Sequence, residues 1–356
     1  MKKTLVAIAA LAAFGAQAQS TVTLKGTFDP TVAQTKTTYG NNAVTSQQSL
    51  GNNGQGTSQV TIVGTEDLGG GLKANFLFEN DFDASKESTG NFASKGGEQY
   101  LGLSGGFGDV KFGGANTPSL DVSGRSPFGT KIGSGFANGG GSGTGKGTTT
   151  YGVQGMGHVR ESNSIVYATP TIAGFTAKAG YQFNADQVLA ANATAVTRAN
   201  ARTDLGLSYV NGPLTAVIAQ YEQKATYKQT HGYVAYQFGA LKATYGFNRD
   251  NRIAAVTGNG AVATGSNLAA GKLAGQNIAA DYAVTPKINL LANYGKLNDK
   301  TTDNFDRKIA AVGVKYTLSP RTSLYARNVS EKMQNNANAW DKKDIKTTLV
   351  GLQHNF

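Results

Sequence analysis

The chain closes with Thr347–Phe356, which reads TTLVGLQHNF and alternates between two faces up to an aromatic last residue. Strict alternation of this kind predicts a β-strand. A membrane barrel needs its last backbone groups paired and its outward side chains in lipid, which this stretch would satisfy. An edge strand of a soluble sandwich fits the ten residues equally well. One face carries Thr348, Val350, Leu352, His354 and Phe356.

The other end of the sequence favours the membrane interpretation. Lys2 and Lys3 precede the apolar run Leu5–Ala16, and Ala16–Ala18 reads A-Q-A. These are the n-region, h-region and cleavage site of a secretory signal peptide. We therefore expect residues 1–18 to be removed and residues 19–356 to form one outer-membrane barrel.

The composition favours a single large β-domain. Cysteine is absent, so an exported chain of this length has no disulfides to hold small modules together. Gly is 47 of 356 residues, and Tyr (15) and Phe (16) far outnumber the single Trp, which suits tight turns and aromatic strands. Removing Lys2 and Lys3 lowers the basic residues from 33 to 31 against 22 acidic ones, so the mature chain is moderately basic.

Period-two alternation recurs along the chain. One face of each segment is apolar or aromatic, and the other is small, polar or charged. The breaks between segments are alternately short and long, which is typical of an outer-membrane barrel with short turns at one rim and long loops at the other. The pattern predicts an all-β, transmembrane antiparallel β-barrel of about 16 strands. Expected short turns lie at 67–70, 105–108, 211–213, 239–240, 285–286 and 319–320, and expected long polar stretches at 38–56, 84–96, 115–160, 184–201, 250–272, 299–305 and 331–342.

Several segments resemble a known family. Gly64–Ala74, Asn163–Pro170 and Val350–Phe356, with the opening Val22–Gly26, are similar to the general diffusion porins of Gram-negative bacteria, of the neisserial and burkholderial type. The resemblance covers the whole chain. It implies a homotrimer of sixteen-stranded barrels in the outer membrane, in which the third long loop folds into the lumen and narrows it.

Residues 115–160 form the candidate constriction loop. The stretch has no convincing alternation, and a loop of this length is usually functional. Asp121 is its only acidic residue, whereas Arg125, Lys131, Lys146 and Arg160 are basic. Just before it, Gly113–Ala115 stands where the family often has Gly-Arg-Gln, so one arginine that the resemblance implies is missing.

The face opposite the apolar one would line the pore. Basic residues outnumber acidic ones there, and an excess of cations in a channel attracts anions. We therefore expect a passive pore that prefers small anionic solutes, although any single lysine could equally well pair with a neighbouring carboxylate. The candidate lining residues are Lys25, Lys73, Glu79, Asp81, Lys111, Asp121, Arg125, Lys131, Lys178, Lys242, Arg307, Lys315 and Arg327, with Asp29 and Asp204.

Three other functions stay open. A substrate-specific channel would saturate with one solute class, a surface adhesin would use its long loops and not conduct, and an outer-membrane hydrolase would need His158 or His231. We expect no enzyme activity, no cofactor and no metal site, because none of the three histidines forms a closely spaced pair. Scattered basic residues argue against nucleic acid and could instead meet lipopolysaccharide phosphates.

Overall fold

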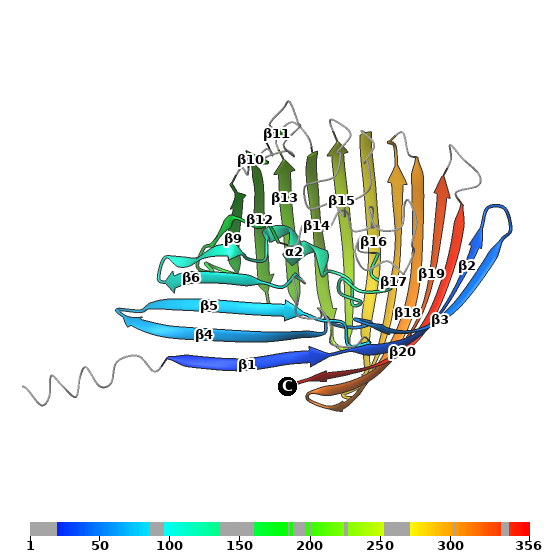
Figure 1. Ribbon diagram of the computed structural model, residues 1–356, viewed down its shortest axis with the longest axis horizontal. Coiled ribbons are helices and arrows are strands. Elements are labelled where there is room, and N and C mark those ends of the chain that lie inside the picture. The colour runs from blue at the N-terminus through cyan, green and yellow to red at the C-terminus, as the bar shows by residue number, and fades with distance from the viewer. Residues whose placement is uncertain are drawn as a thin grey trace, which may run out of the picture.

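The computed structural model describes residues 20–85, 96–135, 160–183, 186–187, 197–198, 201–223, 227–252, 271–301, 304–335 and 342–356. The predicted signal peptide lies outside the described residues. Within them, one antiparallel sheet closes on itself as a barrel (Figure 1). No helix in these ranges is long and apolar enough to cross a membrane.

The wall is built from eighteen paired strand segments. A short helix and a separate pair of two-residue strands, β10 and β11, lie outside this sheet. The elements are β1 (Thr21–Phe28), β2 (Pro30–Tyr39), β3 (Val44–Asn52), β4 (Gln59–Gly69), β5 (Leu72–Asp81), β6 (Gln99–Gly105), β7 (Gly108–Gly114), α2 (Pro118–Ser123), β8 (Ser164–Ala168), β9 (Phe175–Gln182), β10 (Asp186–Gln187), β11 (Thr197–Arg198), β12 (Arg202–Asn211), β13 (Leu214–Gln223), β14 (Tyr227–Phe238), β15 (Leu241–Arg252), β16 (Gly271–Thr285), β17 (Ile288–Asp299), β18 (Phe305–Ser319), β19 (Thr322–Asn335) and β20 (Lys343–Asn355).

Eighteen segments make sixteen wall strands. β1 and β2 are one strand interrupted at Asp29, and β3 and β4 are one strand interrupted at 53–58, because β2 pairs with β3 and β1 pairs with β4. β20 pairs with β19 on one side and with β2 and the end of β1 on the other, which closes the ring. The predicted sixteen-stranded antiparallel barrel is confirmed.

The connections alternate as expected. Every second connection is a short turn, as between β12 and β13 or β18 and β19, and those at the other rim include all the long ones. The prediction of a long loop at 38–56 is wrong, because β2 runs to Tyr39 and β3 already begins at Val44. These strand ends are largely exposed and polar, so they lack the apolar face by which a strand is recognised in sequence.

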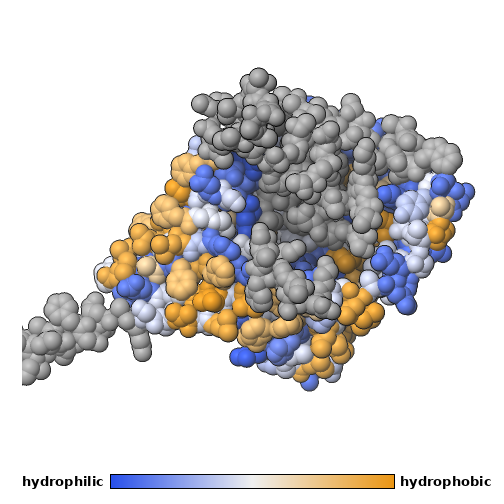
Figure 2. Space-filling model, viewed as in Figure 1, coloured by the Kyte–Doolittle hydropathy of each residue, from blue (hydrophilic) through white to orange (hydrophobic). Residues whose placement is uncertain are grey.

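The apolar register faces outward, as predicted. Val22, Leu24, Ile278 and Val312 are 58–68% exposed, whereas their sequence neighbours on the other register are more buried in the later strands. Figure 2 shows hydrophobic side chains spread over the outer surface near β1, β4 and β5. Exposed apolar area on this scale requires a lipid environment or a protein partner. A few aromatic residues depart from this pattern and are buried inside: Tyr221, Tyr227 and Tyr325.

Asp29 fastens the interrupted strands together. Its buried carboxylate accepts hydrogen bonds from the N–H groups of Gln55 (2.6 Å) and Gly56 and from the hydroxyl of Tyr325 on β19. The Asp29 N–H donates to Ser58 Oγ at 2.9 Å. One carboxylate therefore joins both strand breaks to the strand next to β20.

Replacing Asp29 is expected to weaken the barrel. Asp29→Ala leaves two backbone donors and the Tyr325 hydroxyl without their acceptor, so the free energy of unfolding should fall by about 2 kcal/mol or more. Denaturant unfolding from detergent micelles measures it. Asp67→Ala is the control, because among the described residues that exposed carboxylate accepts a hydrogen bond only from the turn N–H of Gly69. Equal stability of the two variants would contradict the assignment.

Candidate pore constriction

Residues 115–135, here called the inner segment, leave β7 and run along the inside of the wall. The segment begins with α2, where Pro118 fills the first helical turn and Asp121 lies near the positive end of the helix dipole. The Ser119 N–H donates to the buried carboxylate of Asp204 on β12 at 2.9 Å. This bond fixes the start of the inner segment to the inward register of β12.

Two glycines let the inner segment approach the wall closely. A Cβ at Gly206 would lie 2.7 Å from Pro118 Cβ, and one at Gly246 would lie 2.2 Å from Arg125 Nε. Both distances are shorter than any normal contact, so a side chain at Gly206 would press on Pro118 and one at Gly246 would displace the Arg125 side chain. The inward register of β12 and β15 is therefore shaped to receive the inner segment.

A chain of amide hydrogen bonds continues the attachment across β15 to β17. Arg125 Nε donates to Asn277 Oδ1 at 2.7 Å, and Asn277 Nδ2 donates to Asn293 Oδ1 at 3.2 Å. Asn293 Nδ2 in turn donates to the Gly133 carbonyl at 3.0 Å, so the relay starts and ends on the inner segment. Arg125 also donates to the Phe247 carbonyl at 3.3 Å.

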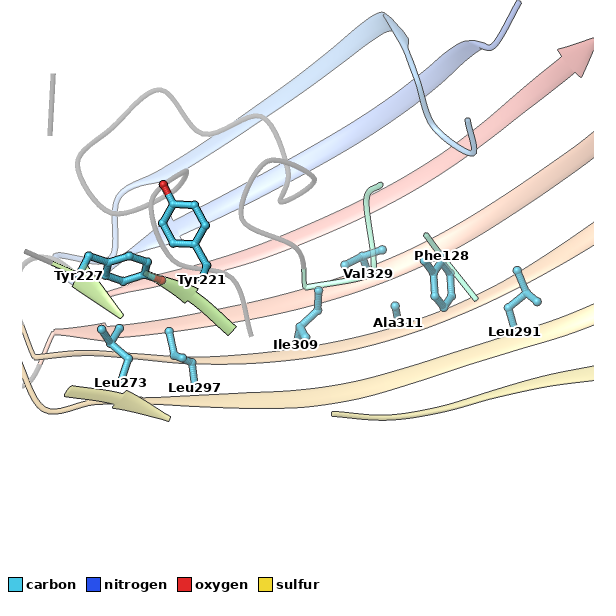
Figure 3. Packing of buried hydrophobic residues seen from close by; sticks show 9 residues of the cluster. All are labelled: Phe128, Tyr221, Tyr227, Leu273, Leu291, Leu297, Ile309, Ala311 and Val329. Carbon is cyan, nitrogen blue, oxygen red and sulfur yellow. The ribbon is translucent and has the colours of Figure 1, made fainter. Parts of the chain in front are cut away.

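Phe128 is the apolar anchor of the inner segment. Its ring is fully buried and packs among the inward residues Leu291, Ala311 and Val329 (Figure 3). The guanidinium of Arg327 lies 4.9 Å from the centre of this ring and donates to the Ile132 carbonyl at 2.9 Å. The arginine is thus held by a cation–π contact and a backbone acceptor.

Lys131 reaches the far side of the barrel. Its Nζ lies 2.6 Å from Thr57 Oγ1, in the break between β3 and β4. The inner segment therefore extends along the inside of the wall from β12 past β19 to the second wall strand. Residues 136–159, with Lys146 and His158, lie outside the described residues, so the narrowing of the lumen by the whole of 115–160 stays a prediction.

Where the chain returns to the wall, two ion pairs and one hydrogen bond hold it. Arg160 pairs with Glu79 on β5 at 3.1 Å, and Arg202 on β12 pairs with Glu161 at 2.6 Å. The Tyr221 hydroxyl donates to the other oxygen of Glu161 at 2.9 Å. Sequence reasoning missed Glu161 and Arg202, because the alternation gives no signal for a pair that meets only in space.

Many of the candidate charges are neutralised by a partner. Arg307 and Glu331 form a buried pair, Lys178 lies 3.3 Å from Asp121, and Lys111 lies 3.6 Å from Asp109. Glu98, which the sequence did not single out, also faces Lys111 at 3.9 Å. These residues therefore pair with neighbouring carboxylates, which is the alternative to a role in attracting anions.

Three basic residues on or against the inner segment have no such partner. Within the part of the chain that the structure describes, no carboxylate lies within 4.0 Å of the cationic nitrogens of Arg125, Lys131 or Arg327. From greater distances, Asp250 acts on Arg125, Asp29 acts on Arg327, and Asp81 and Asp29 act on Lys131. The inner segment and the wall beside it therefore hold three cations that have carboxylates nearby but none at ion-pair distance.

The remaining candidate lysines lie on the inward register of the wall. Lys73 is opposite Asp67 in the strand register, and Lys242 is opposite Asp281, both close to a short turn. Lys315 also lies near a short turn, whereas Lys25 is exposed further along β1. Among the described residues, no hydrogen bond or ion pair joins these four lysines to the inner segment, although Lys315 lines a pocket together with Pro127. Lys25, Lys73 and Lys242 therefore form a group separate from the inner segment.

Comparisons with known proteins agree with this architecture. A family model described as Gram-negative porin matches residues 4–355. Outer membrane porin protein 32 of Delftia acidovorans is 33% identical over 347 residues, covering 91% of this chain and 88% of that protein, and an outer membrane porin protein of Bordetella pertussis is 29% identical over the full length of both. Among solved structures, the anion-selective porin from Comamonas acidovorans superposes with a TM-score of 0.72 at 25% identity, covering 95% of this chain and 100% of that one.

Breaking the amide relay should loosen the inner segment. In Asn277→Ala/Asn293→Ala, Arg125 loses its side-chain acceptor and the Gly133 carbonyl loses its donor, which removes about 1 kcal/mol for each bond. We expect a larger and noisier single-channel conductance in a planar bilayer. The control is Asn298→Ala, whose side chain is exposed on β17. Unchanged conductance of the double variant would show that the relay does not position the segment.

Proposed function

The chain belongs to the Gram-negative porin family, and on that premise we propose that it is a passive, anion-preferring diffusion channel for small hydrophilic solutes and ions across the outer membrane. A sixteen-stranded barrel is too wide for wall side chains alone to fill, which supports a water-filled lumen. The anion preference rests on three cations at the inner segment, Arg125, Lys131 and Arg327. Among the described residues, none of them has a carboxylate within 4.0 Å.

Position in the lumen decides which charges matter most. Near the open rim, lysines such as Lys73 face water and acidic neighbours, and salt screens their field within about 8–10 Å. If the loop narrows the bore at the inner segment, as the family resemblance implies, a charge there would be less screened and would act on every passing ion. Arg125, Lys131 and Arg327 would therefore attract anions and repel cations, and conduction stays fast because no ladder of binding groups is needed.

The outer wall supports the homotrimer implied by the family. From β4 to β9 the outward register carries apolar residues such as Phe76, Leu101 and Phe112, and no outward Lys or Arg occurs on these strands. An apolar arc without basic residues suits contact with another copy of the chain. Lipid, including lipopolysaccharide, would then cover the remaining arc.

A planar bilayer distinguishes the candidate functions. The refolded protein should insert in conductance steps, and the zero-current potential across a KCl gradient should have the sign of chloride permeation. Absence of conductance would overturn the channel and favour an adhesin, and block by a single solute class would favour a substrate-specific channel. A cation-preferring potential would overturn the roles of Arg125, Lys131 and Arg327.

Neutralising the inner cations should weaken selectivity. We expect the zero-current potential of Lys131→Gln/Arg327→Gln to move towards zero by several millivolts in dilute KCl, because two charges leave the level at which screening is weakest. The control is Lys296→Gln/Lys308→Gln, which removes two charges from the outward faces of β17 and β18. Equal shifts in both variants would mean that the net charge of the protein sets the potential.

Selectivity should also depend on alkaline pH. Burial lowers the pKa of Lys131, with Asp81 and Asp29 opposing the shift. Since a lysine loses its charge as the pH rises, anion preference should begin to fall below the pH at which an ordinary lysine titrates, about 10.4. Lys131→Arg should keep its preference through this range, and an identical pH profile for that variant would exclude Lys131 as the titrating group.

A further inference from the structure

A small pocket lies between the inner segment and the rim that carries the short turns. It has a volume of about 230 Å³, and Pro127 of the inner segment lines it together with residues of β16, β17, β18 and β20. Asp281 and Lys315, which line it from β16 and β18, lie near the ends of their strands, where short turns follow. Since the short turns of an outer-membrane barrel face the periplasm, the pocket lies on the periplasmic side of the inner segment.

The pocket carries one charge of each sign. Lys315 and Asp281 both lie on the inward register and are half-buried. Within the described residues, no carboxylate lies within 4.0 Å of Lys315 Nζ, and no basic nitrogen lies within 4.0 Å of the Asp281 carboxylate. Lys242 is opposite Asp281 in the strand register but is not at ion-pair distance. The wall therefore does not neutralise either charge by an ion pair.

Hydrogen bonds fix the polar walls of the pocket. Asn289 Nδ2 donates to Asp281 Oδ1 at 2.7 Å, which orients the carboxylate. On the opposite side, Gln55 Nε2 donates to Gln353 Oε1 at 2.7 Å, and the Gln55 N–H donates to Asp29 at 2.6 Å. A solute that binds here does not have to order these side chains first, which lowers the entropic cost of binding.

Two apolar residues complete the lining. Pro127 comes immediately before the anchor Phe128, and Leu291 is buried in the same cluster as Phe128 (Figure 3). Both are therefore held in place by the attachment of the inner segment to the wall. The pocket is smaller than the roughly 300–1,000 Å³ of sites for drug-sized ligands, so it suits a small solute.

A solute that carries both charges fits this lining better than a simple ion does. An anion beside Lys315 would be repelled by Asp281, and a cation beside Asp281 would be repelled by Lys315. A zwitterion can place its carboxylate at the lysine and its ammonium at the aspartate, so both ends form charge-assisted hydrogen bonds. Pro127 and Leu291 would contact the carbon atoms between the two charges.

We propose that this pocket is a low-affinity binding site for zwitterionic solutes of the α-amino acid class. The site rests on the proposed channel function, because a solute reaches the pocket through the lumen. Weak binding is compatible with passage, since conduction requires that a bound solute can also leave.

Four solutes of nearly equal size test the site at neutral pH. L-alanine carries both charges, L-lactate only the negative one, L-alaninamide only the positive one, and L-lactamide neither. Saturation-transfer NMR of the unaltered chain in neutral detergent micelles should show L-alanine binding about tenfold more tightly than the other three, because only L-alanine satisfies both charged groups. Equal binding of all four solutes would overturn the site.

Two single variants should reverse the preference. Asp281→Asn leaves the lysine alone in the pocket and should bind L-lactate more tightly than L-alanine, whereas Lys315→Gln leaves the aspartate alone and should prefer L-alaninamide. The control, Asp67→Asn/Lys73→Gln, removes two opposite charges that face each other near another short turn and should bind L-alanine like the unaltered chain. Unchanged L-alanine binding in both single variants would contradict the assignment.

The double variant Asp281→Asn/Lys315→Gln keeps the net charge of the chain and separates this site from the channel. In proteoliposome swelling, the unaltered chain should admit L-alanine about twofold faster than L-lactamide, and the double variant should admit both at the same rate, while its conductance and anion preference stay unchanged. Equal rates through a conducting unaltered chain would overturn a role of the pocket in permeation. If the unaltered chain does not conduct but binds L-alanine in micelles, the channel proposal fails and the binding site stands.

Discussion

Every other feature of the barrel depends on the pairing of β20 with the first strand. Backbone groups in lipid have no water to bond, so a sheet can cross a membrane only if its two edges meet. Here the edges meet through β20 and β2, and the final exchange is between the Gly26 and Phe356 backbones, with both N···O distances at 3.1 Å. The terminal residue of the chain is thus part of the wall.

Closure also accounts for the inner segment. A ring of sixteen strands leaves a lumen, and its inward register is polar, so a loop inside it can replace water with hydrogen bonds to the wall. Asp204, Asn277 and Asn293 serve this purpose, while Phe128 supplies a buried apolar contact. The arginines that make these contacts are fixed in place, and a fixed charge gives a steadier field than a mobile one.

Sequence alternation was sufficient to predict the wall but not the contacts inside it. The predicted outward and inward side chains were right for strands such as β17 and β18, because these strands alternate with period two and one face lies in lipid. The alternation did not identify the strands within 38–56, where β2 and β3 extend with polar residues on both faces. It also could not show that Arg307 is neutralised by Glu331 while Arg327 lies on Phe128, since those partners are set by neighbouring strands and by a loop.

Adjacent residues show how strictly the register sorts charge. Arg307 and Lys308 are neighbours, as are Glu331 and Lys332, yet Arg307 and Glu331 pair inside while Lys308 and Lys332 face each other outside. A slip of one residue in either strand would bury a lysine and expose an unpaired acid to lipid, so the interior ion pair and the exterior lysines are fixed together. The exterior placement of the lysines is therefore a consequence of the same register that builds the lumen.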